Sequence, residues 1–229
     1  MSDDDRLLTL VARHTSPDSK LESPLTPVAE LFGGGVVSAE PGVRYRLDAG
    51  GRTIAHALLQ TAGRERVCEI VTPVIDTDHA RELDRLLAPA CALGCTLPVE
   101  AAVHVHFDAE PFRDAGVFAR TVNLFSEDRE RLHERFGTNT ACRNIGPPSA
   151  GLVELVNSPG FAELPWPEAE CRLHGVELFK NRDLNLLNLR SRFPGKDTVE
   201  VRILPGGIDT DRIVAQVDDL RTLLLDAVF

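Results

Sequence analysis

The segment Val103-His104-Val105-His106-Phe107-Asp108 alternates imidazole and carboxylate groups with apolar side chains. A β-strand turns successive side chains to opposite faces, so we expect His104, His106 and Asp108 to share one face. Imidazoles and a carboxylate gathered in this way suit the binding of a metal ion or a phosphate group. An H-x-H segment is also common on solvated strands, and that alternative stays open for the strand taken alone.

A second segment, Thr198-Val199-Glu200-Val201-Arg202-Ile203, repeats the design with a carboxylate and a guanidinium on one face. Glu200 and Arg202 could pair a magnesium ligand with a phosphate clamp, because arginine holds phosphate oxygens through two hydrogen bonds. The alternative is a surface ion pair, which contributes little to stability. Both segments predict a strand with one apolar and one polar face.

A third segment, Cys68-Glu69-Ile70-Val71-Thr72-Pro73, sets one acid in an otherwise apolar strand. A buried carboxylate there is costly unless it meets a cation, whereas a glutamate on an edge strand can simply face water. The segment Val43–Asp48 also alternates. The joint occurrence of four such strands favours a shared polar site more strongly than any one of them does.

The elements that position these residues alternate irregularly along the chain, which favours an α+β domain with a largely antiparallel sheet over a strict βαβ array. Helices are predicted at residues 27–32, 53–61, 77–90 and 111–134 and after Asp209, a further strand at 176–179, and a loop-rich segment at 137–170. Residues 1–26 are polar and rich in Ser and Pro, and we expect a flexible arm. Residues 27–229 are then expected to form a single domain, which would be the catalytic domain.

Composition excludes several function classes. The net charge of the 229 residues is -10, and no Lys/Arg-rich run occurs, which argues against nucleic acid and anionic membranes as partners. The apolar runs are far shorter than the about 20 residues of a membrane-spanning helix. The five cysteines are odd in number and lack paired CxxC spacing, which favours a reducing, cytoplasmic location.

The order of these motifs resembles that of the amidoligase family, within the carboxylate–amine ligases related to glutamine synthetase and glutamate–cysteine ligase. The motifs are Glu69–Pro73, His104–Asp108, Asn185-Leu186, and Thr198–Ile203 followed by Pro205-Gly206. The resemblance covers about residues 40–229. It implies a curved, largely antiparallel sheet with helices packed on one face, which binds ATP and magnesium and forms amides through an acyl phosphate on a small amino acid, peptide or related substrate. A shared fold alone does not prove turnover.

The resemblance also implies a set of metal ligands. Glu69, His104 and Glu200 match acids and a histidine that bind metal in this family. The family's first strand, of the form G-x-E-x-E, has no good copy before Glu69; the nearest relic carries Glu22. Gly175-Val176-Glu177 resembles half of this motif but occupies the wrong part of the chain. Loss of carboxylates would weaken magnesium binding.

The resemblance further implies phosphate-binding and catalytic residues. His106 would face nucleotide phosphate or the acyl substrate, and Arg202 would neutralise charge during transfer. The loop from Arg135 to Asn144 resembles an Arg/Asn-rich segment of the family, and the matching arginine is either Arg143, which we favour, or Arg135. Both are equally well explained as solvated loop cations. Three later polar residues precede the last strand and could reach the nucleotide, but we expect surface positions for them: Lys180, Arg182 and Asn185.

Two other functions remain open from the sequence. A catalytically degenerate relative could keep the sheet as a ligand- or protein-binding module. A zinc amidohydrolase also uses H-x-H on a strand, but its barrel needs about 250 residues, and the remaining histidines show no matching motif. Substrate identity and assembly into a homo-oligomer cannot be predicted from these motifs.

Overall fold

The computed structural model describes residues 35–40, 44–49, 52–59, 68–72, 74–75, 77–92, 97, 101–142, 145–190 and 197–228. Two compact units are present. One comprises residues 1–101 with 207–214, and the other comprises residues 102–206 with 215–229.

The first unit contains an antiparallel meander of four strands in the order β1-β2-β3-β4. Their bounds are Gly35–Glu40, Arg44–Ala49, Arg52–Leu59 and Cys68–Val71. Ala49 pairs with Arg52, so only two residues separate β2 from β3 in the sequence. The strands predicted around Val43–Asp48 and at Glu69 are confirmed.

Strand β3 corrects one expectation, because residues 53–61 were predicted to be helical. The Ala and Leu residues of this segment favour a helix, but β3 pairs with β2 on one side and with β4 on the other. Two hydrogen-bonded ladders outweigh a weak local propensity. The helix predicted at 77–90 is confirmed as α3, His79–Ala92, which continues through Pro89.

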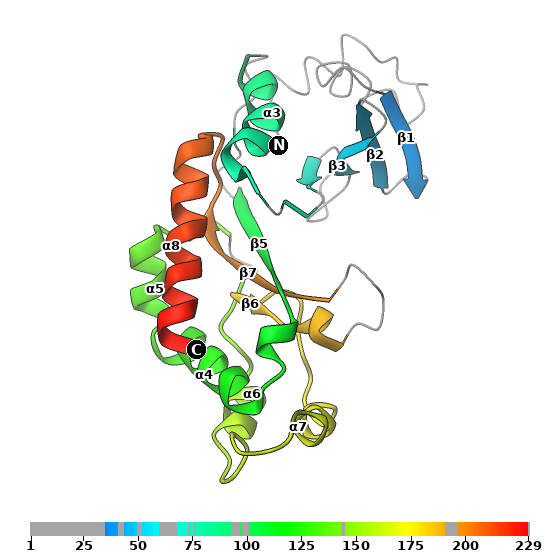
Figure 1. The fold of residues 1–229 in the computed structure, drawn as a ribbon. Coiled ribbons are helices and arrows are strands. Elements are labelled where there is room, and N and C mark those ends of the chain that lie inside the picture. Colours follow the sequence, from blue (N-terminus) through cyan, green and yellow to red (C-terminus); the bar gives the residue numbers. More distant parts are fainter. Residues whose placement is uncertain are drawn as a thin grey trace. The chain divides into compact units, whose positions relative to one another are not determined.

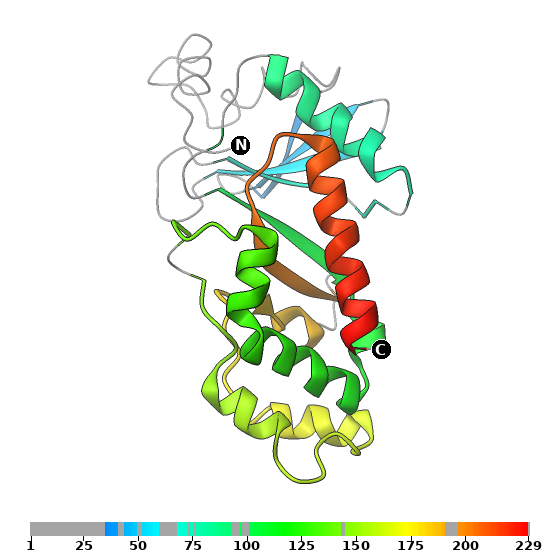
Figure 2. The same ribbon diagram turned by 90° about the vertical axis from the view of Figure 1, so that its left-hand side faces the viewer.

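The second unit contains a three-stranded antiparallel sheet in the order β5-β7-β6. Its strands are β5, Ala102–Asp108, β6, Leu184–Asn185, and β7, Thr198–Pro205. Helices α4, Ala115–Glu127, α5, Arg129–Phe136, and α8, Thr210–Val228, lie on one side of β5 and β7 in both views (Figures 1 and 2). The α+β class and the antiparallel sheet with helices on one face are therefore confirmed.

Local signals explain where the helices of this unit begin and end. Asp114 accepts a hydrogen bond from the backbone N–H of Val117 at 2.9 Å and so caps the start of α4. Gly137 ends α5 in the left-handed conformation, with φ 65°, which glycine adopts at little cost. The shorter elements are η3, Glu110–Phe112, α6, Ala150–Val156, α7, Trp166–Leu173, and η4, Leu187–Arg190.

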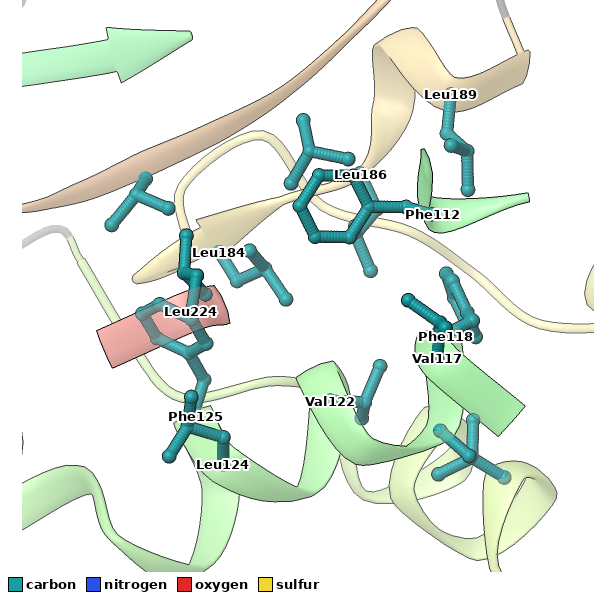
Figure 3. Close-up of a cluster of buried hydrophobic side chains, with 14 of the residues drawn as sticks. Phe112, Val117, Phe118, Val122, Leu124, Phe125, Leu184, Leu186, Leu189 and Leu224 are labelled. Carbon is teal, nitrogen blue, oxygen red and sulfur yellow. The ribbon is translucent and has the colours of Figure 1, made fainter. Parts of the chain in front are cut away.

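The core of this unit lies between the apolar face of the sheet and the helices. Val199, Val201 and Ile203 of β7 are each 0% exposed. Figure 3 shows Val122 and Phe125 of α4 in the same cluster as Leu184, Leu186 and Leu224. Alternation along β7 thus buries one side of the strand and leaves the other for polar residues.

The loop-rich character predicted for residues 137–170 is confirmed for most of the segment, which also contains the helix α6 and the start of α7, two short helices that were not predicted. Residues 176–179, predicted as a strand, form no strand, and the two-residue strand β6 follows instead. Short elements carry little periodicity, so packing decides them. Within the described part of the chain, no helix combines the length and the apolar character needed to cross a membrane.

Candidate functional site

Three neighbouring strands place a row of polar residues side by side. His106 of β5 pairs directly with Glu200 of β7, and Glu200 pairs on its other side with Asn185 of β6. Side chains directly opposite each other in an antiparallel sheet are in contact. The register therefore brings together residues that are up to 94 positions apart in the sequence, of which one is the expected metal ligand Glu200.

Glu200 is the centre of this row and is only 5% exposed. Its Oε2 accepts a hydrogen bond from Asn185 Nδ2 at 2.5 Å. Its Oε1 lies 3.2 Å from His104 Nδ1, 3.5 Å from Arg202 Nε and 3.8 Å from His106 Nε2. A buried carboxylate is costly unless partners compensate its charge, and these groups provide that compensation.

The position of His104 depends on an irregularity in the sheet. Val103 pairs with Leu204 and Val105 pairs with Val201, so the single residue His104 faces two residues, Arg202 and Ile203. Such a β-bulge bends a strand and re-aims its side chains. At this bulge, Arg202 Nε donates a hydrogen bond to His104 Nε2 at 3.3 Å.

His104 is uncharged at neutral pH. Burial, followed by the positive charge of Arg202, lowers the pKa of His104 from 6.5 to about 4, although Glu200 opposes the shift. Because Nε2 accepts a hydrogen bond from Arg202, the ring proton is on Nδ1, the nitrogen that faces Glu200. The contact between His104 and Glu200 is therefore polar but is not an ion pair.

His106 is the accessible member of the cluster, with 45% of its side chain exposed. Its Nδ1 lies 3.0 Å from Thr198 Oγ1, which also accepts a hydrogen bond from Asn188 Nδ2 at 3.3 Å. Arg202 is held in turn by the carbonyl oxygen of Lys180, at 2.8 Å from Nη1. The polar face thus combines a fixed carboxylate, a fixed guanidinium and one imidazole that solutes can reach.

A divalent cation fits part of this cluster. Two ligands at about 2.1 Å from one ion and at right angles to each other are roughly 3 Å apart, and His104 Nδ1 and Glu200 Oε1 are separated by 3.2 Å. His104 can offer Nδ1 only if its proton moves to Nε2, and Arg202 must then turn away. In the described residues, no set of three His, Cys, Asp or Glu side chains is arranged around a common metal position.

Two residues predicted from the sequence, Arg135 and Asp108, are not brought into this cluster. Arg135 pairs with Asp219 of α8, at 2.5 Å from Nη2 to Oδ1 and 3.0 Å from Nε to Oδ2. Asp108 accepts a hydrogen bond from the backbone N–H of Glu110 at 3.1 Å. Glu22 and Arg143 lie outside the described residues, and of Glu69 only the backbone, in β4, is described.

Asn185 corrects the expectation of a surface position, since it is 4% exposed and holds Glu200. Lys180 is exposed as expected, and Arg182 is half-buried with its guanidinium 4.7 Å from the ring centre of Phe179. The sequence did not predict that the hydroxyl group of Thr198 contacts His106, because this contact depends on the pairing of Thr198 with Asp108 at the end of β7. The Asn185-Leu186 motif was the one signal in the sequence that pointed to the carboxylate-holding residue.

The fold and the cluster together define an α+β protein with a polar site on an antiparallel sheet. A family model described as "Putative amidoligase enzyme" matches residues 2–222. This match covers nearly the whole sequence, and the chain belongs to this amidoligase family. Comparison with curated proteins found no match. Comparison with solved structures found none either.

Proposed function

We propose that the protein is an ATP- and magnesium-dependent ligase with a fold like that of the glutamine synthetase catalytic domain, which joins a small carboxylic acid to an amine. A carboxylate oxygen attacks the γ-phosphorus of ATP and releases ADP, which gives an acyl phosphate. The amine nitrogen then attacks the acyl carbon, phosphate leaves, and the nitrogen loses a proton. Family membership supports the ligase class, and the cluster around Glu200 supports the site.

The observation that carries the proposal is the buried Glu200 with a guanidinium, two imidazoles and an amide around it. Asn185 fixes one oxygen of Glu200, and the other oxygen faces His104 and Arg202. A carboxylate held in this way is preorganised as a cation ligand, and catalysis of phosphoryl transfer is mostly positioning and electrostatic stabilisation.

Each residue of the cluster has a separate role in this proposal. Glu200 and His104 would hold magnesium, which when bound screens the charge on the phosphate oxygens. Arg202 is adjacent to both and would stabilise the charge that develops on the transferred phosphoryl group. His106, the exposed imidazole, would contact phosphate or the acyl group.

Glu200→Gln tests the proposal because it keeps the shape of the side chain and removes its charge. Loss of one preorganised electrostatic contact typically costs about 3 kcal/mol in the transition state, so we expect ADP release with a panel of acids and amines to fall at least about hundredfold. The matched control is Glu177→Gln, an exposed glutamate in the half-motif noted above, which should keep the wild-type rate. Wild-type turnover in Glu200→Gln would refute the assignment.

A binding module without catalysis is the second candidate, favoured by the lack of a good copy of the G-x-E-x-E motif before Glu69 in the sequence. Calorimetry with ATP and magnesium separates the two candidates. The ligase predicts nucleotide binding together with ADP release that depends on both substrates. Nucleotide binding without release under any substrate pair would favour the binding module.

A further inference from the structure

Asp183 is a buried acid directly before the two-residue strand β6, and it is not a member of the polar row described above. Its side chain is 0% exposed. Its Oδ2 accepts a hydrogen bond from Arg129 Nε of α5 at 2.5 Å. His133 Nε2, one turn further along α5, lies 3.1 Å from the same oxygen but is not aligned as a hydrogen bond. A charged contact thus attaches helix α5 to the chain just ahead of β6.

The backbone of Asp183 connects this contact to the candidate site. Its carbonyl oxygen accepts a hydrogen bond from the backbone N–H of Arg202 at 2.8 Å, and its own N–H donates to the carbonyl oxygen of Gly146 at 2.8 Å. Two residues further along the chain, Asn185 pairs with Glu200 and donates to its carboxylate. Asp183 therefore adjoins two members of the site, Arg202 through a backbone hydrogen bond and Asn185 through the chain.

Strand β6 needs an anchor of this kind because it is so short. Two residues form few ladder hydrogen bonds, and strands usually have three residues or more. The burial of Leu184 draws the segment to the core, but apolar packing is non-directional and does not fix its position along β7. The amide of Asn185 must be placed accurately, since its bond to Glu200 is 2.5 Å long and a displacement of about 1 Å would break it.

The carboxylate of Asp183 is poorly suited to stabilising the fold. Its Oδ1 is buried and has no hydrogen-bond partner among the described residues. A buried acceptor without a donor is unfavourable, and apolar residues of similar size in place of a buried ion pair are often neutral or stabilising. An acid at such a position is better explained by what it positions than by the stability it adds.

We propose that Asp183, held by Arg129, is a positioning residue that fixes β6 on β7 and thereby places Asn185 against Glu200. It acts through the amide of Asn185 and the backbone N–H of Arg202. In linking this placement to turnover, the inference rests on the proposed function.

The test is Arg129→Gln in the full chain, without nucleotide or metal, followed by NMR of the ¹⁵N-labelled protein. The side-chain amide signal of Asn185, assigned with Asn185→Asp, should shift towards that of a solvated asparagine. Hydrogen exchange of the Arg202 backbone N–H should accelerate at least about tenfold more than that of Val122, a fully buried residue of α4 that reports on the core. A wild-type Asn185 signal, or equal acceleration at both N–H groups, would overturn the inference.

Two further variants keep the test decisive. Asp183→Asn removes the charge and keeps the backbone contacts, so it replaces Arg129→Gln if that variant folds poorly, and it should shift the Asn185 signal in the same direction. Asp219→Asn is the matched control, because Asp219 pairs with another arginine of α5, Arg135. The control should leave the Asn185 signal unchanged. A shift of the same size in the control would refute the assignment to Asp183.

Kinetics separates this inference from the proposed function. Arg129→Gln should lower kcat for ADP release about tenfold or more and change KM by less than about threefold, because the reacting groups are misplaced but not removed. A displaced Asn185 signal in a protein that never releases ADP from ATP would refute the ligase and leave the positioning role standing. Ligase activity in the wild type with an unchanged kcat in Arg129→Gln would do the reverse.

Discussion

The charge states of Glu200 and His104 depend on how deeply each is buried and on the polar groups around it. Glu200 is almost completely buried, and its negative charge is compensated by Asn185, Arg202 and the ring proton of His104. His104 stays neutral because burial and the guanidinium of Arg202 outweigh the attraction of Glu200. A neutral imidazole can later act as a cation ligand, whereas an imidazolium cannot.

The lowered pKa of His104 predicts how the stability of the metal-free protein depends on pH. Between about pH 6.5 and pH 4 the unfolded chain binds a proton at this histidine and the folded chain does not. The free energy of unfolding should therefore fall as the pH is lowered through this window, by at most about 3 kcal/mol. Above about pH 6.5, His104 no longer lowers the free energy of unfolding, because it is neutral in both states.

Urea unfolding with a chelator present, compared between wild type and His104→Gln, measures this effect. The variant should lose this part of the pH dependence, whereas His174→Gln, at an exposed histidine, should behave like wild type. The same slope in His104→Gln and wild type would show that another group titrates.

At the scale of elements, the sheet β5-β7-β6 needs the helices behind it, because the residues that form the polar row alternate with residues that must be buried. Helix α4 supplies much of that cover, with Phe118 and Phe125 each 1% exposed. Phe118 also contacts Trp166 of α7 and Phe161, with ring centres 5.7 Å and 6.4 Å apart. Helix α4 thus connects the core of the sheet to the elements between α6 and β6.

Phe118→Ala should lower the free energy of unfolding by about 3–5 kcal/mol, since it removes a buried ring and leaves a cavity. Thermal or urea unfolding measures the change. Phe179→Ala, at a phenylalanine that is 38% exposed, is the control and should cost about 1 kcal/mol or less. A loss below 1 kcal/mol in Phe118→Ala would mean that α4 does not hold this core together.

At the scale of the whole molecule, charge limits the partners that the protein can bind. Asp and Glu outnumber Lys and Arg by 35 to 25. Several of the described arginines are also committed to internal contacts: Arg113 with Asp197, Arg129 with Asp183, and Arg135 with Asp219. Small substrates that meet a few placed cations are compatible with this distribution, whereas an extended polyanion is not.

We therefore predict that the protein does not bind duplex DNA or RNA. Nucleic-acid affinity comes largely from the release of counterions by clustered Lys and Arg, and no such run occurs in this sequence. Electrophoretic mobility at low salt and micromolar protein should show free nucleic acid only. A shifted band that disappears as salt is raised would contradict the prediction.

By itself, the sequence determined the two alternating strands β5 and β7, the residues on their polar faces, the long helices and membership of the amidoligase family. These features depend on neighbours within a few positions, where a period of two or 3.6 is visible. Short or conflicting signals failed, as in β3 and in the helices α6 and α7.

Only the tertiary structure decided which polar residues meet. Arg202 donates a hydrogen bond to His104, which is 98 positions away in the sequence. Asn185, on the two-residue strand β6, donates a hydrogen bond to Glu200, and Arg129 donates one to Asp183, 54 positions away. Strand register, a single bulge opposite His104 and the burial of each group set these contacts. They are properties of the packed chain, because burial and pairing between distant segments arise only when the segments are brought together.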